Sequence, residues 1–445
     1  MDKIREIALK TLYKIDEQEA YSNIVLKEFL KEKRNKLDDR DVGLISEIVY
    51  GVTTWKLTLD EIIKKYSKIR LKKISPWILN ILRMGIYQIV FLDKIPKSAA
   101  VNESVNLAKR YGHKSSSNFV NAILRKVNDN DYKELFNIKD DVERISKTTS
   151  MPIWIVERLL EENTIEQVEE ICSASNIRPK VTVRVNRLKI KKEELERLLK
   201  ERNIEYTQGT MDDFLILNKV KNIENLDLFK NGYFTVQDEG AGIIALVLDV
   251  KEEEKILDAC SSPGGKTTYM AELMKNNGEI HAWDLYKHRV GLVEENAERL
   301  GINIIKAKCE DASIYKEEYK EKFDKILLDV PCLGIGVLKR KPDIKWKRKE
   351  EDIKEITQIQ KKILETCSKY LRKGGQLVYS TCSIFKEENE DIIEKFLEKN
   401  KEFEYSKIVG ENYKYFTKSQ KNQAILNLIP NKESDGFFIC KLQKK

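Results

Sequence analysis

Two of the seven cysteines follow short apolar runs in the C-terminal half of the chain. Cys332 lies in the run 327–336, and Cys382 lies in the run 378–383. A thiolate is a strong nucleophile, and a helix N-terminus or a nearby cation such as Lys266 would favour the thiolate over the thiol. Either cysteine alone could equally be a small buried side chain, so the interpretation depends on what stands beside it.

The other cysteines give no sign of a metal site. The chain has no Cys-x-x-Cys pair and only three histidines, so we do not expect zinc or another metal. The first ten residues mix charged and apolar side chains at helical spacing, which is not the pattern of a signal peptide. We therefore expect reduced thiols in the cytoplasm, four of them structural: Cys172, Cys309, Cys367 and Cys440.

The segment 255–268 has the pattern of a strand, a glycine turn and a helix start. Gly264 and Gly265 let the backbone approach a ligand, and the helix N-terminus offers unpaired N–H groups. A P-loop for nucleotide phosphates is an alternative, because Gly265-Lys266-Thr267 matches its end. That motif needs a glycine at position 260, where this chain has cysteine, and a dinucleotide-binding G-x-G-x-x-G is absent.

Two acidic residues follow the next two predicted strands. Asp284 directly follows the strand 279–283 and is placed to accept hydrogen bonds from ribose hydroxyls. A glycine loop that lacks a phosphate-binding motif, combined with an acid placed to bind ribose, points to S-adenosylmethionine as the cofactor. Asp311 is the candidate for the adenine edge. The alternatives are a helix cap for Asp284 and an ordinary loop acid for Asp311.

A thiolate beside a methyl donor has a defined use on pyrimidines. Carbon 5 of cytosine is too electron-poor to attack a methyl group, but addition of a thiolate to carbon 6 makes carbon 5 nucleophilic. Methylation of an adenine amino group is disfavoured, because Asp329-Val-Pro-Cys332 replaces the Asn/Asp-Pro-Pro-aromatic loop of such enzymes.

Alternating strands and helices from about Phe234 onward predict a mostly parallel, seven-stranded, Rossmann-like sheet. We expect the fourth and fifth strands to be neighbours, which brings Cys332 and Cys382 to one carboxyl edge, where ligands bind in such sheets. The predicted strands cover 255–259, 279–283, 303–307, 325–329, 376–380, 424–428 and 437–441.

At these motifs the chain resembles the RNA 5-methylcytosine methyltransferases of the NOL1/NOP2/Sun class. The segments that carry the resemblance are 258–266, 329–332, 381–383, 236–240 and 340–346. Small departures are Ser261-Ser262, where Ala-Ala is common, and Leu333, where a small residue usually follows the Pro-Cys motif.

The resemblance implies a class I methyltransferase that binds S-adenosylmethionine. It implies that Cys382 is the nucleophile and that Cys332 assists release of the methylated RNA. The residues that it places at the cofactor are Cys260, Ser261, Ser262, Pro263, Gly264, Gly265, Lys266, Asp284, Asp311 and Asp329.

Three domains are predicted for the 445 residues. Apolar residues at spacings of three and four make residues 1–140 all-helical, and this part resembles the NusB-like RNA-binding fold. Residues 141–233 read as a small α/β linker domain with an RRM-like pattern, and residues 234–445 as the methyltransferase domain. The appended helical domain is typical of the RsmB/Sun enzymes, which methylate small-subunit rRNA.

The segment 338–349 contains seven basic residues and one acid directly beyond Cys332. This density predicts a loop that contacts RNA phosphates, through Lys339, Arg340, Lys341, Lys345 and Trp346. Trp346 could stack on a base or anchor the loop, and the sequence leaves both open.

Composition limits the class of protein. Apolar residues are 41% and charged residues 35%, and no apolar run approaches the roughly 18 residues of a membrane helix. The net charge of +8, from 81 basic and 73 acidic residues, agrees with an RNA partner without requiring one. We expect a monomer that acts on 16S rRNA; a tRNA substrate and a non-catalytic ribosome assembly factor are the alternatives.

Overall fold

The computed structural model describes residues 3–18, 20–33, 37–220, 222–409 and 422–445. Its internal contacts divide the chain into two compact units. The first contains Met1–Ile177 together with Leu338–Glu350, and the second contains Arg178–Val337 together with Glu351–Lys445. The chain therefore passes from one unit to the other three times.

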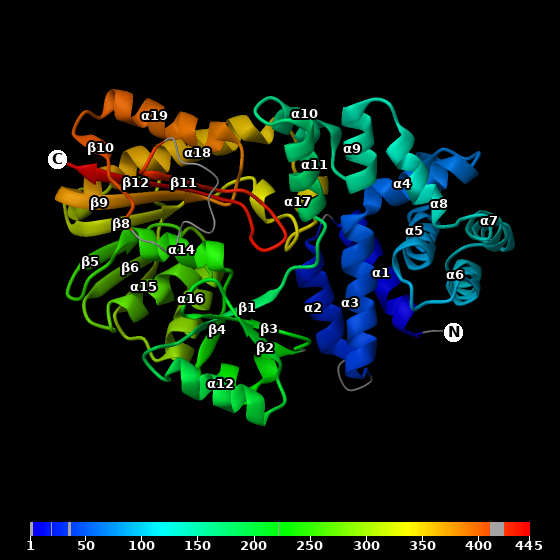
Figure 1. Ribbon diagram of the computed structural model, residues 1–445, viewed down its shortest axis with the longest axis horizontal. Coiled ribbons are helices and arrows are strands. Elements are labelled where there is room, and N and C mark those ends of the chain that lie inside the picture. Colours follow the sequence, from blue (N-terminus) through cyan, green and yellow to red (C-terminus); the bar gives the residue numbers. More distant parts are fainter. Residues whose placement is uncertain (1–2, 19, 34–36, 221, 410–421) are drawn as a thin grey trace. The chain divides into compact units, whose positions relative to one another are not determined.

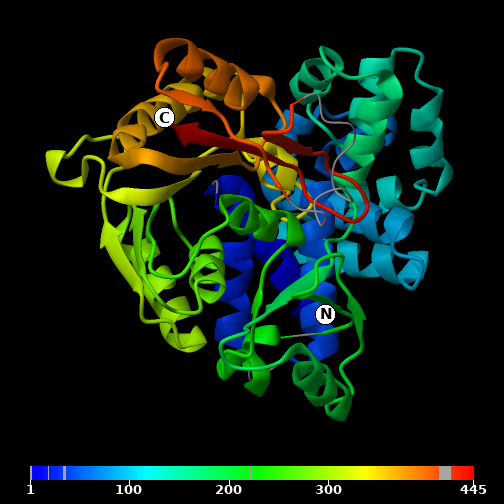
Figure 2. The ribbon, with the colours of Figure 1, turned by 60° about the vertical axis from the view of Figure 1, so that its left-hand side comes forward.

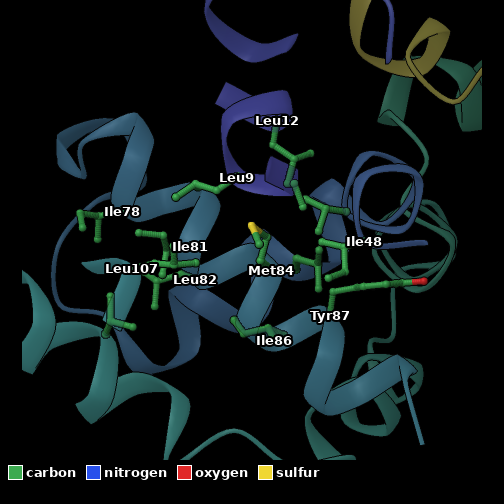
Figure 3. Close-up of a cluster of buried hydrophobic side chains, with 14 of the residues drawn as sticks. Leu9, Leu12, Ile48, Ile78, Ile81, Leu82, Met84, Ile86, Tyr87 and Leu107 are labelled. Atoms are coloured by element: carbon green, nitrogen blue, oxygen red, sulfur yellow. The ribbon is translucent and has the colours of Figure 1, made fainter. Parts of the chain in front are cut away.

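The first unit is helical throughout its described part, as the spacing of its apolar residues predicted. Its long central helix α5 begins at Pro76, directly after the N-cap residue Ser75, where proline loses no helical hydrogen bond. Apolar residues from α1, α3, α5 and α6 form one buried cluster (Figure 3). The helices are α1 (Lys3–Glu17), α2 (Ser22–Lys33), α3 (Asp39–Thr54), α4 (Lys56–Tyr66), α5 (Pro76–Phe91), α6 (Lys97–Tyr111), α7 (Lys114–Leu124), α8 (Asn130–Glu134), α9 (Asp141–Thr149), α10 (Ile153–Leu160), α11 (Ile165–Ala174) and α17 (Ile344–Lys347).

The second unit begins with a small antiparallel sheet in the strand order β2-β3-β1-β4 (Figure 1). Alternating residues of β1 and β3 pack on α12 and form a separate buried cluster, which includes Val183, Leu195 and Leu215. The elements are β1 (Val181–Val185), α12 (Lys192–Glu201), β2 (Tyr206–Gln208), β3 (Phe214–Leu217), α13 (Asp227–Lys230) and β4 (Phe234–Val236).

The larger sheet has the strand order β10-β12-β9-β8-β5-β6-β7, and β11 pairs with β12 outside this path. The strands β7, β6, β5, β8 and β9 are parallel, while β10, β11 and β12 pair antiparallel. Helices α18 and α19 cover one face, and α14, α15 and α16 cover the other (Figures 1 and 2). The elements are α14 (Glu239–Leu248), β5 (Lys255–Asp258), α15 (Gly265–Leu273), β6 (Glu279–Asp284), α16 (Lys287–Leu300), β7 (Ile305–Cys309), β8 (Phe323–Asp329), α18 (Asp352–Cys367), β9 (Leu371–Thr381), α19 (Glu390–Lys399), β10 (Phe403–Tyr405), β11 (Ile425–Leu428) and β12 (Phe437–Lys444).

The predicted fold class is confirmed: a helical N-terminal part, a small α/β part and a Rossmann-like sheet that is parallel in its centre. Every predicted strand of the large sheet is present, and the sheet gains the short strand β10, giving eight strands in all. The boundaries 1–140, 141–233 and 234–445 remain a prediction. Among the described residues, none of the helices combines the length and the apolar character that crossing a bilayer requires.

Candidate active site

The two cysteines meet at the carboxyl edge of the large sheet. Strands β8 and β9 pair in parallel with Asp329 opposite Ser380, so the loops that follow them leave the sheet side by side. The Sγ atoms of Cys332 and Cys382 lie 2.9 Å apart in a thiol–thiol hydrogen bond, and the backbone N–H of Cys382 donates to Sγ of Cys332 at 3.3 Å. Both side chains are half-buried and neither is in a disulfide. The structure thus brings together the pair that strand adjacency predicted.

A lysine and an aspartate lie next to this pair. Nζ of Lys266 donates to Oδ2 of Asp329 at 2.6 Å, and Oγ of Ser380 donates to Oδ1 of Asp329 at 2.9 Å. Burial acts to lower the pKa of Lys266, but Asp329 first and Cys382 next outweigh it, so the pKa is raised above its usual value. The raised pKa favours the charged form of Lys266, and its charge interacts with Cys382.

The two thiols have different surroundings. The hydrogen bond to Cys382, burial and the nearby carboxylates of Glu388 and Asp329 together raise the pKa of Cys332 well above its usual value. These surroundings favour the neutral form of the Cys332 thiol. Lys266, in contrast, carries a positive charge that interacts favourably with charge on Cys382.

The glycine loop leaves the N-terminus of α15 accessible. Gly264 is the N-cap residue with a φ of 98°, a left-handed conformation that favours glycine. A Cβ at Gly265 would meet only Gln237, at 3.7 Å, so little of the protein approaches the backbone there. Oγ of Ser262 and Oδ1 of Asp258 are buried polar atoms without a hydrogen-bond partner. This open backbone and these unsatisfied atoms fit a small polar ligand that carries amino and carboxylate groups, as S-adenosylmethionine does.

The predicted ribose and adenine acids lie along the same edge. Asp284 ends β6 and is buried, and its Oδ1 accepts a hydrogen bond from the N–H of Tyr286 at 3.2 Å. It does not cap α16, whose N-cap residue is Tyr286, so the cap alternative is wrong. Asp311 follows the neighbouring strand β7 and accepts from the N–H of Ser313 at 2.8 Å.

The small sheet braces the glycine loop through a residue that sequence reasoning missed. Arg184 of β1 is fully buried and donates to the backbone carbonyl of Gly265 at 2.9 Å and to Glu272 of α15 at 2.6 Å. Its signal was a single arginine within the alternating segment 181–185. A buried charge needs a partner, and here the partner lies 88 residues away in sequence.

The basic segment packs within the helical unit. Lys345 is only 1% exposed, and its Nζ donates to Oδ1 of Asn176 at 2.5 Å. Nε1 of Trp346 donates to the carbonyl of Thr53 at 2.6 Å, which supports the anchoring role over base stacking. Burial keeps the Lys345 ammonium from solvent, so the structure does not present it to a phosphate.

The rest of the predicted RNA-contacting set lies before α17. Lys341 is exposed, whereas Lys339 and Arg340 are half-buried. Their contact with RNA remains a prediction. The described residues contain no group of three or more His, Cys, Asp and Glu side chains arranged to hold a metal ion.

Three family models match consecutive parts of the chain. The model described as 16S rRNA methyltransferase RsmB/F matches residues 245–443, and the NusB family model matches residues 2–129. A third model, the ferredoxin-like domain of RsmF/B-like methyltransferases, matches residues 151–224.

Two relatives and one solved structure match nearly the whole chain, and a second solved structure matches about two thirds of it. The probable ribosomal RNA small subunit methyltransferase B of Bacillus subtilis is 38% identical over 99% of both chains, and the ribosomal RNA small subunit methyltransferase B of Shewanella oneidensis is 31% identical over 99% of both. The crystal structure of PH0851 aligns with a TM-score of 0.81 and 27% identity over 98% of both chains. A methyltransferase homolog protein from Pyrococcus horikoshii aligns with a TM-score of 0.60 and 28% identity, covering 69% of this chain and all of its own. By its sequence and its fold, the chain belongs to the RsmB/F family of 16S rRNA methyltransferases.

Proposed function

We propose that this protein transfers a methyl group from S-adenosylmethionine to carbon 5 of a cytosine in small-subunit (16S) rRNA. The observation that carries the proposal is the pair of thiols, Cys332 and Cys382, 2.9 Å apart beside the Lys266–Asp329 ion pair. A methyltransferase that acted on an exposed amino or hydroxyl group would need no thiol at this edge.

The reaction begins with Cys382. Its thiolate, stabilised by the positive charge of Lys266, adds to carbon 6 of the cytosine and makes carbon 5 nucleophilic. S-adenosylmethionine, when bound, supplies the electrophilic methyl group. A base then removes the proton from carbon 5, the bond between Sγ and carbon 6 breaks, and Cys332 assists release of the product.

The remaining residues have binding roles in this proposal. The loop from Cys260 to Lys266 and the acids Asp284 and Asp311 hold the cofactor along the edge formed by β5, β6 and β7. Asp329 fixes the Lys266 ammonium, since it also accepts a hydrogen bond from Ser380 and cannot turn away. Together these groups orient the reactants rather than take part in covalent chemistry.

The test uses the two cysteine variants with 16S rRNA from cells that lack this protein. Cys382→Ala is expected to abolish methyl incorporation from labelled cofactor. Cys332→Ala is expected to accumulate a covalent protein–RNA complex that persists in denaturing gels, because the intermediate forms and is not released. A complex trapped by Cys382→Ala through Cys332 would reverse the two roles.

The same assay separates the alternatives. Methyl incorporation into undermethylated tRNA but not into rRNA would favour the tRNA substrate, and no incorporation into either would favour a non-catalytic assembly factor. Bisulfite mapping of rRNA from cells with and without the protein would then locate the cytosine.

A further inference from the structure

One buried carboxylate links the loops that carry the two cysteines, and the proposed reaction does not use it. Glu388 is fully buried in the short turn 386–388 between β9 and α19. Burial of a carboxylate is costly unless hydrogen bonds compensate it, so the donors that reach Glu388 indicate which parts of the fold it holds in place.

The Glu388 carboxylate accepts hydrogen bonds from the residues that directly follow the two cysteines. Its Oε2 accepts from the N–H of Leu333 at 2.9 Å, and its Oε1 accepts from the hydroxyl of Ser383. Leu333 follows Cys332, and Ser383 follows Cys382. A single carboxylate therefore joins the two loops next to the contact between their sulfur atoms, which lie 2.9 Å apart.

On the Cys332 side, the peptide groups before and after the cysteine are both held. Nε2 of the fully buried Gln360 donates to the carbonyl of Pro331 at 3.0 Å and to Oε2 of Glu388 at 2.9 Å. Since Glu388 also accepts from the N–H of Leu333, the two side chains bracket Cys332. The segment 331–334 is not part of a strand, so these contacts hold it where strand pairing does not.

Cys382 has further supports of its own. It directly follows β9, a strand that is paired on both sides, with β8 and with β12. The carbonyl of Ser383 accepts from Nδ2 of Asn389, the N-cap residue of α19, at 3.1 Å. Loss of the Glu388 carboxylate should therefore displace Cys332 more than Cys382.

We propose that Glu388 is a positioning residue that holds the sulfur atom of Cys332 against that of Cys382. Its role in the reaction is to keep Cys332 in place for release of the methylated product, and this role rests on the proposed function. The spacing of the two sulfur atoms is a property of the free protein, so it can be measured without RNA or cofactor.

The spacing is measured as the affinity of the free, full-length protein for arsenite, which binds two adjacent thiols far more tightly than one. Arsenous acid forms two arsenic–sulfur bonds and releases two water molecules, each carrying one thiol proton. The wild type should bind arsenite tightly, and Cys332→Ala should bind it only weakly. Equal affinities of these two proteins overturn the proposal, because the two sulfur atoms are then not held together.

Two substitutions of Glu388 separate its hydrogen bonds from its volume. In Glu388→Gln the amide oxygen can still accept from Leu333 and Gln360, and the Ser383 hydroxyl can turn to accept from the amide nitrogen. Glu388→Met keeps a similar volume and removes the oxygen acceptors. We expect Glu388→Met to weaken arsenite binding about ten-fold, as loss of a hydrogen bond to a charged group does, and Glu388→Gln to stay close to the wild type. Equal affinities of the wild type and Glu388→Met overturn the proposal.

Matched controls come from the two helices that flank the cluster. Glu394→Met replaces an exposed glutamate of α19, Gln358→Met replaces an exposed glutamine of α18, and both should bind arsenite as the wild type does. Gln360→Met releases the carbonyl of Pro331 and should weaken binding. A loss in the two exposed variants as large as that in Glu388→Met contradicts the proposal.

Labelling with a reagent for single thiols distinguishes lost spacing from a disturbed site. The rate at which iodoacetamide alkylates Cys382 should be the same in Glu388→Met as in the wild type, because this reaction does not need the second thiol. A change in that rate as large as the change in arsenite affinity would mean that the substitution disturbs the whole site, and the proposal would be wrong.

A last assay tests the role in release. With undermethylated 16S rRNA and labelled cofactor, Glu388→Met should accumulate the covalent protein–RNA complex expected of Cys332→Ala, because Cys382 still adds to the base while Cys332 is misplaced. Normal turnover of Glu388→Met without the complex contradicts this role. Arsenite binding involves neither RNA nor cofactor, so failure of the proposed function would leave the result on the spacing unchanged.

Discussion

Asp258 is the residue with the clearest conflict between burial and charge. It ends β5 with 1% of its surface exposed, and its Oδ2 accepts from Oγ1 of Thr267 at 2.7 Å while Oδ1 has no hydrogen-bond partner. Burial raises its pKa to about 7, with the charge of Asp329 adding to the rise and Thr267 and Lys266 opposing it. Near neutral pH this carboxyl is thus balanced between its two forms.

This raised pKa predicts how Asp258→Asn changes stability with pH. The folded protein holds the proton between the unfolded value of 3.8 and about 7, so the wild type loses stability as the pH rises through this window. The loss approaches about 1.4 kcal/mol per pH unit. The asparagine can still accept from Thr267 and does not titrate, so the variant should be the more stable protein at pH 8 and closer to the wild type at pH 4.5.

The measurement is thermal unfolding of the free protein at the two pH values. Asp249→Asn, which alters an exposed carboxylate in the same unit, is the control and should show no such pH-dependent gain. An equal gain for Asp258→Asn at both pH values would mean that the carboxyl does not titrate in this range.

Sequence reasoning found the residues whose type and motif indicate a chemical role. Cys332, Cys382, Lys266 and Asp329 stand in recognisable motifs at strand ends, and the structure brings them together. Glu388 gave no such signal, because it lies in the run 386–391, rich in acidic residues typical of a solvated helix start. Its buried carboxylate accepts hydrogen bonds from Gln360 of α18 and from the N–H of Leu333 in the loop after β8, and no local pattern encodes those partners.

At the scale of elements, β1 and α15 are joined by the Arg184–Glu272 ion pair. Both side chains are at most 2% exposed, and their nitrogen–oxygen separation is 2.6 Å. Burial raises the pKa of Glu272, and Arg184 opposes that rise. Without the arginine, the helix that begins at the glycine loop would contain an uncompensated buried carboxylate.

We therefore expect Arg184→Met to destabilise the second unit by about 3–5 kcal/mol, the usual cost of removing one partner of a buried pair. The double variant Arg184→Met/Glu272→Met should recover a large part of that loss, since it leaves no buried charge. Urea unfolding of the two single variants and the double variant gives the coupling energy. Additive losses would show that the two side chains act independently.

The predicted RNA contact of the segment before α17, which contains Lys339, Arg340 and Lys341, can be tested at Lys341. If Lys341 neutralises an RNA phosphate, Lys341→Ala should weaken binding of 16S rRNA fragments and reduce the slope of log K against log salt by about 0.7. Lys362→Ala, at an exposed lysine of α18, is the matched control. Equal slopes for wild type and Lys341→Ala would remove this residue from the RNA interface.

The periodicity of apolar residues located most helices and strands but not every strand or its pairing register. The strands 255–259 and 279–283 were predicted to within one residue of their observed ends, because apolar runs and neighbouring breakers define them. Strand β10 has three residues, too few for a period of two to stand out. The strand predicted over 376–380 extends over 371–381 as β9, with Gly374 and Gly375 inside it, where the pairing register with β8 shifts.

At the scale of the whole molecule, the chain leaves the second unit after Val337 and returns at Glu351. The intervening segment packs on the helical unit through specific contacts. The carboxylate of Asp343 accepts from the N–H and the hydroxyl of Ser22 at 3.1 and 2.6 Å, and Lys347 stacks over the ring of Tyr21. These partners are more than 300 residues apart in sequence. Sequence reasoning could not see these contacts, so it interpreted the segment from its charge density alone, as an RNA-binding loop.

Lys345 makes this packing sensitive to pH. Burial lowers its pKa to about 7, whereas an unfolded lysine titrates near 10.5. Between these values the unfolded chain binds a proton that the folded unit does not, so stability rises with pH across this window. Burial raises the pKa of the neighbouring Cys172 to about 12, so that thiol stays neutral throughout.

Lys345→Met removes the titration while keeping an apolar stem of similar length. Its loss of the hydrogen bond to Asn176 is independent of pH, so the informative quantity is how the stability difference from wild type changes between pH 7 and pH 9. We expect the wild type to gain about 2 kcal/mol on the variant over this interval, from the difference between the two lysine pKa values. Hydrogen exchange of the α11 amides at both pH values measures this, with Lys349→Met, at an exposed lysine of the same segment, as the control. A stability difference that does not change with pH would mean that Lys345 keeps its charge in the folded protein. A buried ammonium would then need an anionic partner within the segment's surroundings.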